Sequence, residues 1–195
     1  MDGNSPRHKQ FLDPRIERSR RVIRQAALIE FAESGYGGFT IESVAARAGV
    51  GRSTVYRLWG TKLALISDAL EVLNEQPAPD FTAARTREGV ETLLRHLSET
   101  LAGSAFSACI PALVEAAEHD AGVRAFHHRY SAVRRQALTD AITAGIDAEE
   151  LSPTIDPDLA SLALAGALFY RRLMCDKPFD PGQVCDLVDA VLGPG

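Results

Sequence analysis

The chain has 195 residues, 46% of them hydrophobic and 24% charged, a balance that is typical of a folded globular protein and excludes general disorder. No window approaches the roughly 18 consecutive apolar residues that a membrane span needs. The net charge of −5 is uneven, because residues 1–62 hold eleven Lys and Arg against six Asp and Glu while the rest hold ten against twenty. A basic head on an acidic body predicts that the head meets a polyanion.

The first stretch, MDGNSPRHKQFLDPR, is polar and lacks the apolar run of a signal peptide, so residues 1–14 are expected to form a flexible arm. The three cysteines, Cys109, Cys175 and Cys185, form no CxxC pair. This pattern argues against a disulfide framework or a zinc site and favours the reducing cytoplasm. We expect all three to be small packing residues, since free cysteine is usually buried.

Nearly the whole chain is expected to be helical, because Ala and Leu dominate and alternating runs of β-branched residues are missing. A first helix is predicted over 15–34, with Gly35 as its left-handed end and with an apolar stripe at helical spacing made of Ile16, Ile23, Ala27 and Phe31. Thr40 is expected to cap a short helix over 41–47, and another short helix covers 52–58. A longer helix follows Thr61 and stops at PAPD, residues 77–80, the best linker candidate.

The second half is predicted to hold five more helices, over about 83–102, 104–117, 120–144, 157–175 and 181–192. The last two share a start signal, in which a capping carboxylate precedes a proline at the first helical position. These starts are Asp156-Pro157 and Asp180-Pro181.

The stretch IESVAARAGVGRSTVYRL, which begins at Ile41, has the pattern of a helix-turn-helix. Ala45 is small enough for two helices to touch, and Gly49 tolerates the positive φ of the turn. Apolar side chains fall where such a pair must bury them, at Val44, Ala48, Val50, Val55 and Leu58. The positions left to face outward, which in this motif enter the major groove, are Arg52, Ser53, Thr54, Tyr56 and Arg57.

The chemistry of these side chains suits DNA. Arg52 can donate to guanine O6 and N7, and Ser53 and Thr54 can bond bases or phosphates. Phosphate contacts are expected from Tyr56, Arg57 and Lys62, and from Thr40 at the positive end of its helix. Trp59 is expected in the core. Solvated surface and contact with the DNA backbone are both open for Arg18, Arg20, Arg21 and Arg24.

Residues 15–66 resemble the N-terminal domain of the TetR family of transcriptional regulators. RVIRQAALIEFAESGYGGFTIESVAARAGVGRSTVYRLWGTKLAL is similar to that family's signature nearly end to end, including STVY in the recognition helix. The resemblance implies DNA-facing positions at Thr40, Arg52, Ser53, Thr54, Tyr56, Arg57 and Lys62. Gly51 and Gly60 depart from the family, which more often has Ser or another polar residue there.

The resemblance also implies that 15–62 form the DNA-binding domain and 63–195 a helical effector-binding and dimerisation domain. DPDLASLALAGALFYRRLM and VCDLVDAVL independently carry apolar stripes at helical spacing. In the family the last two long helices pair with those of a second copy, and the alternative is packing within one chain. The expected interface residues are Leu159, Leu162, Gly166, Phe169, Tyr170, Leu173, Leu187, Val188 and Val191.

A ligand pocket is implied among the middle helices, where apolar and aromatic side chains are candidate lining: Phe106, Cys109, Leu113, Phe126, Tyr130 and Val133. Ordinary core is the alternative for each. The histidines His119, His127 and His128 lack the i,i+4 pair of a helical metal site, so we expect neither a metal nor a cofactor. Arg134-Arg135 and Arg171-Arg172 could pair with an anionic ligand or lie at the surface or an interface.

The sequence therefore predicts an all-α protein with an N-terminal three-helix helix-turn-helix domain and a C-terminal helical bundle. Its expected function is that of a cytoplasmic, homodimeric repressor that binds a palindromic double-stranded operator and is released by an unknown small-molecule effector, with no membrane partner. Two alternatives stay open. One is a DNA-binding partner protein that responds to no ligand, and the other is an all-helical enzyme whose helix-turn-helix is only architectural.

Overall fold

The structure is a computed structural model that describes residues 14–73 and 86–194, and every regular element in these ranges is helical. The predicted all-α fold is confirmed. The arm expected over 1–14 lies outside the described residues except for Pro14, and so does the linker expected at 77–80. In chain order the elements are α1 (Pro14–Gly38), α2 (Ile41–Ala48), α3 (Arg52–Trp59), α4 (Lys62–Leu73), α5 (Thr86–Gly103), α6 (Ala105–His119), α7 (Ala121–Asp147), α8 (Pro157–Met174), the 3-10 turn η1 (Pro181–Gln183) and α9 (Val184–Leu192).

Two of the differences from the expected helix ends have local reasons. Gly35 adopts the predicted left-handed φ of 65°, but one more turn follows it to Gly38, with the N–H of Phe39 donating to the Gly35 carbonyl at 3.0 Å. The helix expected over 181–192 is divided, because the carboxylate of Asp180 accepts from the N–H of Gly182 at 2.9 Å and tightens the first turn into η1.

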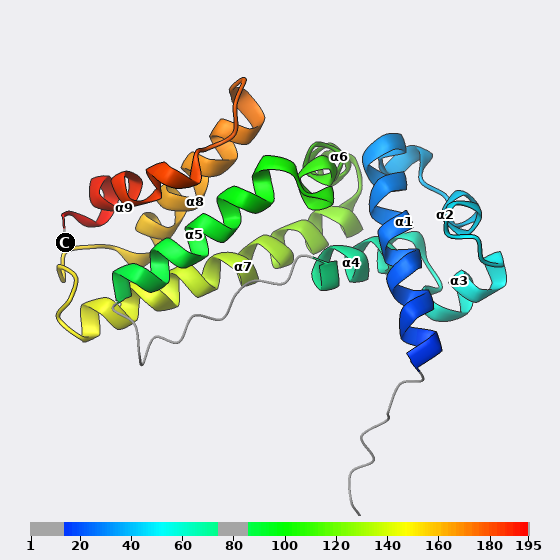
Figure 1. Ribbon diagram of the computed structural model, residues 1–195, viewed down its shortest axis with the longest axis horizontal. Helices are drawn as coiled ribbons and strands as arrows, with labels where there is room; N and C mark the ends of the chain where they lie inside the picture. Colours follow the sequence, from blue (N-terminus) through cyan, green and yellow to red (C-terminus); the bar gives the residue numbers. More distant parts are fainter. Residues whose placement is uncertain (1–13, 74–85, 195) are drawn as a thin grey trace, which may run out of the picture.

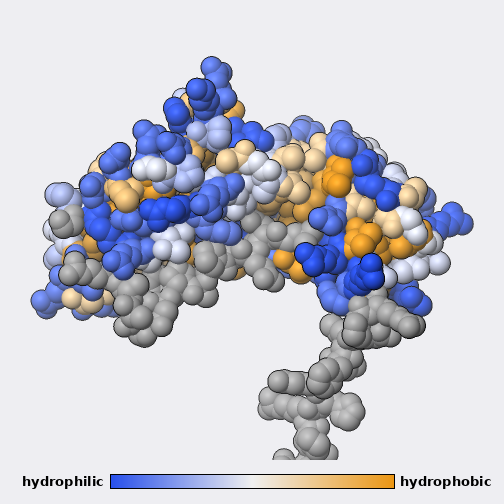
Figure 2. All heavy atoms as spheres, in the orientation of Figure 1, coloured by the Kyte–Doolittle hydropathy of each residue, from blue (hydrophilic) through white to orange (hydrophobic). Residues whose placement is uncertain are grey.

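The helices form two parts that meet at α1 (Figure 1). α1 to α4 lie at one end, and the body is built from α5 to α9, with α7 running along most of its length. α1 packs most extensively on α6 and next on α4. In the view of Figure 2, hydrophilic residues cover much of the body, and hydrophobic ones gather near α1 and its contact with α6. No single helix in the described ranges is long and apolar enough to cross a membrane, and α5 with α6 passes that test only as a pair bent by 81°.

The core begins on α1, where Ile23, Ala27 and Phe31 are fully buried. Ile16, which the sequence assigned to the same stripe, is 44% exposed, because it lies before the point at which the other helices cover α1. α4 then links the two parts, since it packs on α1 and also on α7. The hydroxyl of Tyr130 on α7 donates to the backbone carbonyl of Leu70 on α4 at 3.4 Å.

A buried arginine joins three helices of the N-terminal part. The Nε of Arg24 on α1 donates to Oδ2 of Asp68 on α4 at 2.8 Å, and another guanidinium nitrogen contacts Glu17 at 2.9 Å. The indole of Trp59, at the end of α3, donates to the same Oδ2 at 2.6 Å. Burial lowers the pKa of Arg24, but Asp68 and Glu17 more than offset that effect, and the net shift is upward. The Arg24 cluster, as we name Arg24, Glu17, Asp68 and Trp59, therefore remains charged and paired.

The expectation that all three cysteines are packing residues is wrong for two of them. Cys109 is buried between α6 and α1, where its thiol donates to the carbonyl of Leu28 at 3.2 Å. Cys175 is exposed directly after the end of α8, and Cys185 is exposed on α9. Cys175 lies beyond the last residue of α8 and Cys185 lies on the exposed side of α9, so small size alone does not decide burial.

Replacing Asp68 by Ala leaves the buried guanidinium of Arg24 with Glu17 as its remaining acidic partner and removes the acceptor of Trp59. We expect the free energy of unfolding to fall by about 3 kcal/mol, measured by urea denaturation followed by circular dichroism. Glu71→Ala, at an exposed position of the same helix, is the control and should change stability by less than about 0.5 kcal/mol. Equal unfolding midpoints for the two variants would contradict a structural role for the Arg24 cluster.

Candidate functional site

The turn between α2 and α3 depends on Gly49. Its φ of 67° and ψ of 32° lie in the left-handed region, which glycine enters without steric cost. Its N–H donates to the carbonyls of Ala45 and Ala46, and the N–H of Val50 donates to Ala45 at 3.0 Å. Val44 and Ala45 are buried beneath the turn. The predicted helix-turn-helix is thus present.

α3 has an inward and an outward face. Val55 is fully buried, and Leu58 and Trp59 are half-buried against the core. The side chains that the sequence assigned to DNA contacts on this helix lie together on its other side. Exposed there are Arg52, Ser53, Tyr56 and Arg57, with Thr54 half-buried.

Arg47 fixes α2 to α1 through two carboxylates. Its guanidinium contacts Glu30 at 3.1 Å and also binds Glu33. A hydrogen bond from Ser43 and the contact with Arg47 lower the pKa of Glu30 against the opposing effect of burial. The charge of Arg47 is therefore used within the domain.

Arg52 and Arg57 differ from Arg47 in this respect. Neither forms an ion pair with any residue in 14–73 or 86–194. Both guanidinium groups are on the exposed face of α3, so their positive charge is available to a polyanion.

For one of the four α1 arginines that the sequence left open, neither of the two expected roles, solvated surface or contact with the DNA backbone, is correct. Arg24 is buried in the Arg24 cluster and presents no charge to a partner. Arg18 and Arg21 are exposed, and Arg20 is half-buried.

Three further predicted DNA-contact residues bind within the chain. The Oγ1 of Thr40 accepts from the N–H of Ser43 at 3.0 Å and caps α2 as expected. The ammonium of Lys62 donates to the carbonyl of Tyr36 at 2.9 Å and lies 3.9 Å from the centroid of that ring. Because an ammonium has three donors, this bond leaves Lys62 others. The hydroxyl of Tyr56 donates to Glu42 at 3.3 Å.

The two glycines that depart from the family pattern have different backbone conformations. Gly51, the N-cap of α3, has φ −69° and ψ 137° and offers no side-chain acceptor to the first turn. Gly60 follows α3 with φ 72°, and its N–H donates to the carbonyl of Tyr56 at 2.8 Å. A side chain would be strained at Gly60 but not at Gly51.

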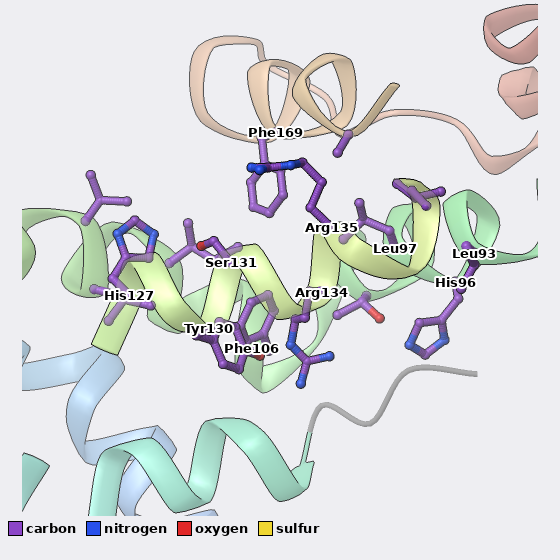
Figure 3. Close-up of a pocket in the computed structure, with 16 residues that line it drawn as sticks. Leu93, His96, Leu97, Phe106, His127, Tyr130, Ser131, Arg134, Arg135 and Phe169 are labelled. Carbon is purple, nitrogen blue, oxygen red and sulfur yellow. The ribbon is translucent and has the colours of Figure 1, made fainter. Parts of the chain in front are cut away.

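A cavity of about 110 Å³ lies in the body among α5, α6, α7 and α8 (Figure 3). Of the six residues expected to line a pocket, the structure brings three to this cavity: Phe106, Leu113 and Tyr130. Cys109 and Phe126 are buried elsewhere in the core, and Val133 is 67% exposed. These three lie on other faces of α6 and α7.

The remaining lining residues were not predicted from the sequence. α5 contributes Leu93, His96, Leu97 and Thr100, whose i, i+3, i+4, i+7 spacing marks one helix face and could have indicated them. α7 contributes His127, Ser131, Arg134, Arg135 and Leu138, and α8 contributes Ala165 and Phe169. Among the described residues, no three His, Cys, Asp or Glu side chains could jointly hold a metal ion.

The α8 stripe that the sequence assigned to a dimer interface is largely exposed. Leu159 is 66% and Tyr170 63% exposed, and Leu162, Gly166 and Leu173 are exposed with them. α8 instead packs on its own chain through Ala160, Ser161, Leu164 and Leu168.

Other members of the expected interface have different positions. Phe169 borders the cavity and is half-buried, and Leu187 and Val191 of α9 are half-buried. Val188 is fully buried within the chain, because its face of α9 packs on the body. It is not available to a second copy, and the expectation for it is corrected.

A helix-turn-helix with a polar, cationic outer face, joined to a helical body, defines a DNA-binding transcriptional regulator. Comparison with known families agrees. The family model "Bacterial regulatory proteins, tetR family" matches residues 23–77, and "Tetracyclin repressor-like, C-terminal domain" matches residues 83–191. The chain belongs to the TetR family.

Relatives match over nearly the whole length. The chain is 27% identical to the HTH-type transcriptional regulator YdeS of Bacillus subtilis over 180 residues, which cover 90% of this chain and 88% of YdeS. It is 28% identical over 184 residues to the DNA-binding transcriptional repressor TetR of Mycobacteroides abscessus, covering 89% and 94%.

Solved structures share the fold. A TetR transcription regulator from Haloarcula marismortui has a TM-score of 0.69 at 19% identity, covering 90% of this chain and 99% of that one. AibR in complex with isovaleryl coenzyme A and operator DNA has a TM-score of 0.64 at 19% identity, covering 91% and 100%.

Serine substitutions at Gly49 and Gly51 form a matched pair for the turn. Gly49→Ser places a Cβ at a φ of 67° and should lower the free energy of unfolding by about 1–2 kcal/mol. Gly51→Ser fits the existing backbone and supplies a capping hydroxyl, so stability should rise by a few tenths of a kcal/mol. Thermal unfolding measures both, and a Gly49→Ser variant as stable as Gly51→Ser would contradict the strained turn.

Proposed function

We propose that the protein is a homodimeric repressor that binds a palindromic operator and leaves it when a small molecule occupies the cavity. A single recognition helix reads few base pairs, and two helices must lie about 34 Å apart to enter successive major grooves. The exposed apolar face of α8, with Leu159, Leu162 and Tyr170, supports pairing of two copies through this helix, since a contiguous apolar patch favours association.

The proposed contacts follow the chemistry of the exposed face. Arg52 reads guanine, and Ser53 and Thr54 contact base edges or phosphates. Tyr56, Arg57, Lys62 and Thr40 bind phosphates and fix the register. The proposal assigns DNA binding to residues 15–62 and effector binding with dimerisation to 63–195, with α4 packed on both.

The observation that carries the effector part is the position of α6. Phe106 and Leu113 on one side of this helix line the cavity, and Cys109 on another side bonds to Leu28 of α1. α1 also packs on α2 and α4, and α3 packs on both of these helices. A ligand that displaces α6 would therefore displace α1 and, with it, the helices against which α3 packs. Differential affinity of the ligand for two positions of α6 would change occupancy of DNA.

The comparisons support this proposal by analogy. The Mycobacteroides abscessus relative is named a DNA-binding transcriptional repressor, and AibR has been solved with both isovaleryl coenzyme A and operator DNA.

Selection of bound duplexes from a random DNA library tests the central claim. We expect an enriched inverted repeat with half-site centres about 10 base pairs apart, or a multiple of that spacing. Enrichment of no sequence at low salt would overturn the proposal of a specific operator.

Two arginine variants then separate base reading from phosphate binding. Arg52→Ala should cost about 1–3 kcal/mol of binding and relax specificity at one position of each half-site, whereas Arg57→Ala should weaken all sequences alike and reduce the salt dependence. Fluorescence anisotropy on the selected site and its single-base variants measures both. A uniform loss for Arg52→Ala would instead make Arg52 a phosphate contact.

The α8 face yields a test of the dimer. Leu162→Glu places a carboxylate in the proposed interface and should convert the protein to a monomer with at least tenfold weaker operator binding, measured by analytical ultracentrifugation and anisotropy. Val133→Glu introduces the same charge at an exposed apolar position of α7 and should leave both unchanged. A dimeric Leu162→Glu protein would exclude the centre of this face from the interface.

A further inference from the structure

One edge of the cavity is a row of polar side chains on α7. His127, Ser131 and Arg135 occur at i, i+4 and i+8 and all line the cavity, so their Cβ atoms follow one another at about 6 Å along one helix face. In Figure 3 the three side chains lie on the side of α7 that faces α8, and Arg135 extends toward Phe169. The row offers a ligand hydrogen-bond donors of three kinds.

The charges around the cavity have one sign. Its lining includes Arg134 and Arg135 with two histidines, and none of the described lining residues is Asp or Glu. Arg134 lies against the ring of Tyr130, with its guanidinium carbon 4.4 Å from the centroid. Arg135 is half-buried and has no hydrogen bond or ion pair to a described residue.

His127 contributes hydrogen bonding more than charge. Burial, and secondarily the neighbouring His128, lower the pKa of its imidazole, so it is predominantly neutral near pH 7. The positive charge on the polar edge therefore comes from Arg135.

Most of the remaining lining is apolar and extended, and its polar members are His96 and Thr100 of α5 with Arg134 of α7. Leu93 and Leu97 of α5 and Phe106, Ile110 and Leu113 of α6 form its walls. The lining residues of α7 run from His127 to Leu138, a length of about 16 Å at the helical rise of roughly 1.5 Å per residue. A long apolar wall beside one cationic edge fits a molecule with the same division.

We propose that the cavity takes an elongated apolar carboxylic acid, bound as its carboxylate by Arg135 and Ser131, with its hydrocarbon part against α5 and α6. The proposal rests on the proposed function and specifies the chemical class of its effector. A guanidinium suits this role because it presents two parallel donors to a carboxylate. An apolar cation of the same shape is disfavoured, because it would lie beside two arginines with no carboxylate among the described lining residues.

Three ligands of matched length test the charge. The uncharged fluorophore N-phenyl-1-naphthylamine reports occupancy of the cavity in the full chain, and decanoate, decan-1-ol and decyltrimethylammonium compete with it at neutral pH. We expect decanoate to displace the fluorophore at a concentration at least tenfold lower than the alcohol, and the cation to be the weakest. An equal or stronger effect of the cation overturns the proposal.

Variants then test the residue. Arg135→Gln should raise the decanoate concentration at half displacement about tenfold or more and leave decan-1-ol nearly unchanged. Arg129→Gln makes the same substitution at an exposed position of α7 outside the lining and should alter neither ligand. Ser131→Ala, a small change at an exposed site, should weaken decanoate alone and provides a second readout if Arg135→Gln does not fold.

The outcomes distinguish this inference from the function on which it rests. Displacement by all three ligands without preference for the carboxylate, or a preference that survives in Arg135→Gln, overturns the anionic class and leaves a ligand-binding cavity. If neither the fluorophore nor any competitor binds, measured also by isothermal titration calorimetry, both the inference and the effector part of the proposed function fail.

Discussion

The burial of one guanidinium constrains three of the four helices of the N-terminal part. A charge removed from water must be paired and hydrogen-bonded, and Arg24 meets this requirement only where α1, α3 and α4 come together. Asp68 accepts from both Arg24 and Trp59, so the end of the recognition helix is tied to the same carboxylate as the helix behind it. The outer face of α3 is therefore oriented by a contact on the opposite, inner side of the helix.

α6 has the corresponding place between the two parts. It is the main partner of α1 and a wall of the cavity, so the two parts are joined by direct packing of helices. α4 adds a second link through Leu70 and Tyr130. A change of packing in the body would thus reach α1 and α4 together, since tightly packed interiors transmit displacement instead of absorbing it.

Local patterns made the helix-turn-helix predictable. Thr40, Gly49 and Val55 each act through neighbours a few residues away, by capping, by a positive φ or by helical spacing, so sequence order alone contained the information. The body was less predictable because its cavity is assembled from four helices. The apolar stripe of α8 was recognised, but which side of a helix rich in Ala and Leu faces its own core is decided by packing. Arg24 and Val188 show the same limit, since only the assembled fold reveals that both are buried.

The cysteines give the molecule a built-in measure of its internal motion. Thiol reagents attack the thiolate, and burial raises the pKa of Cys109 to about 12, while a hydrogen bond to Glu91 raises that of Cys185. Cys175 is exposed directly after the end of α8. The chain therefore carries two exposed thiols and a buried one that a reagent reaches only when α6 separates from α1. The rate at which Cys109 is labelled therefore measures how often the contact between α6 and α1 opens. This contact joins the body to the DNA-binding helices.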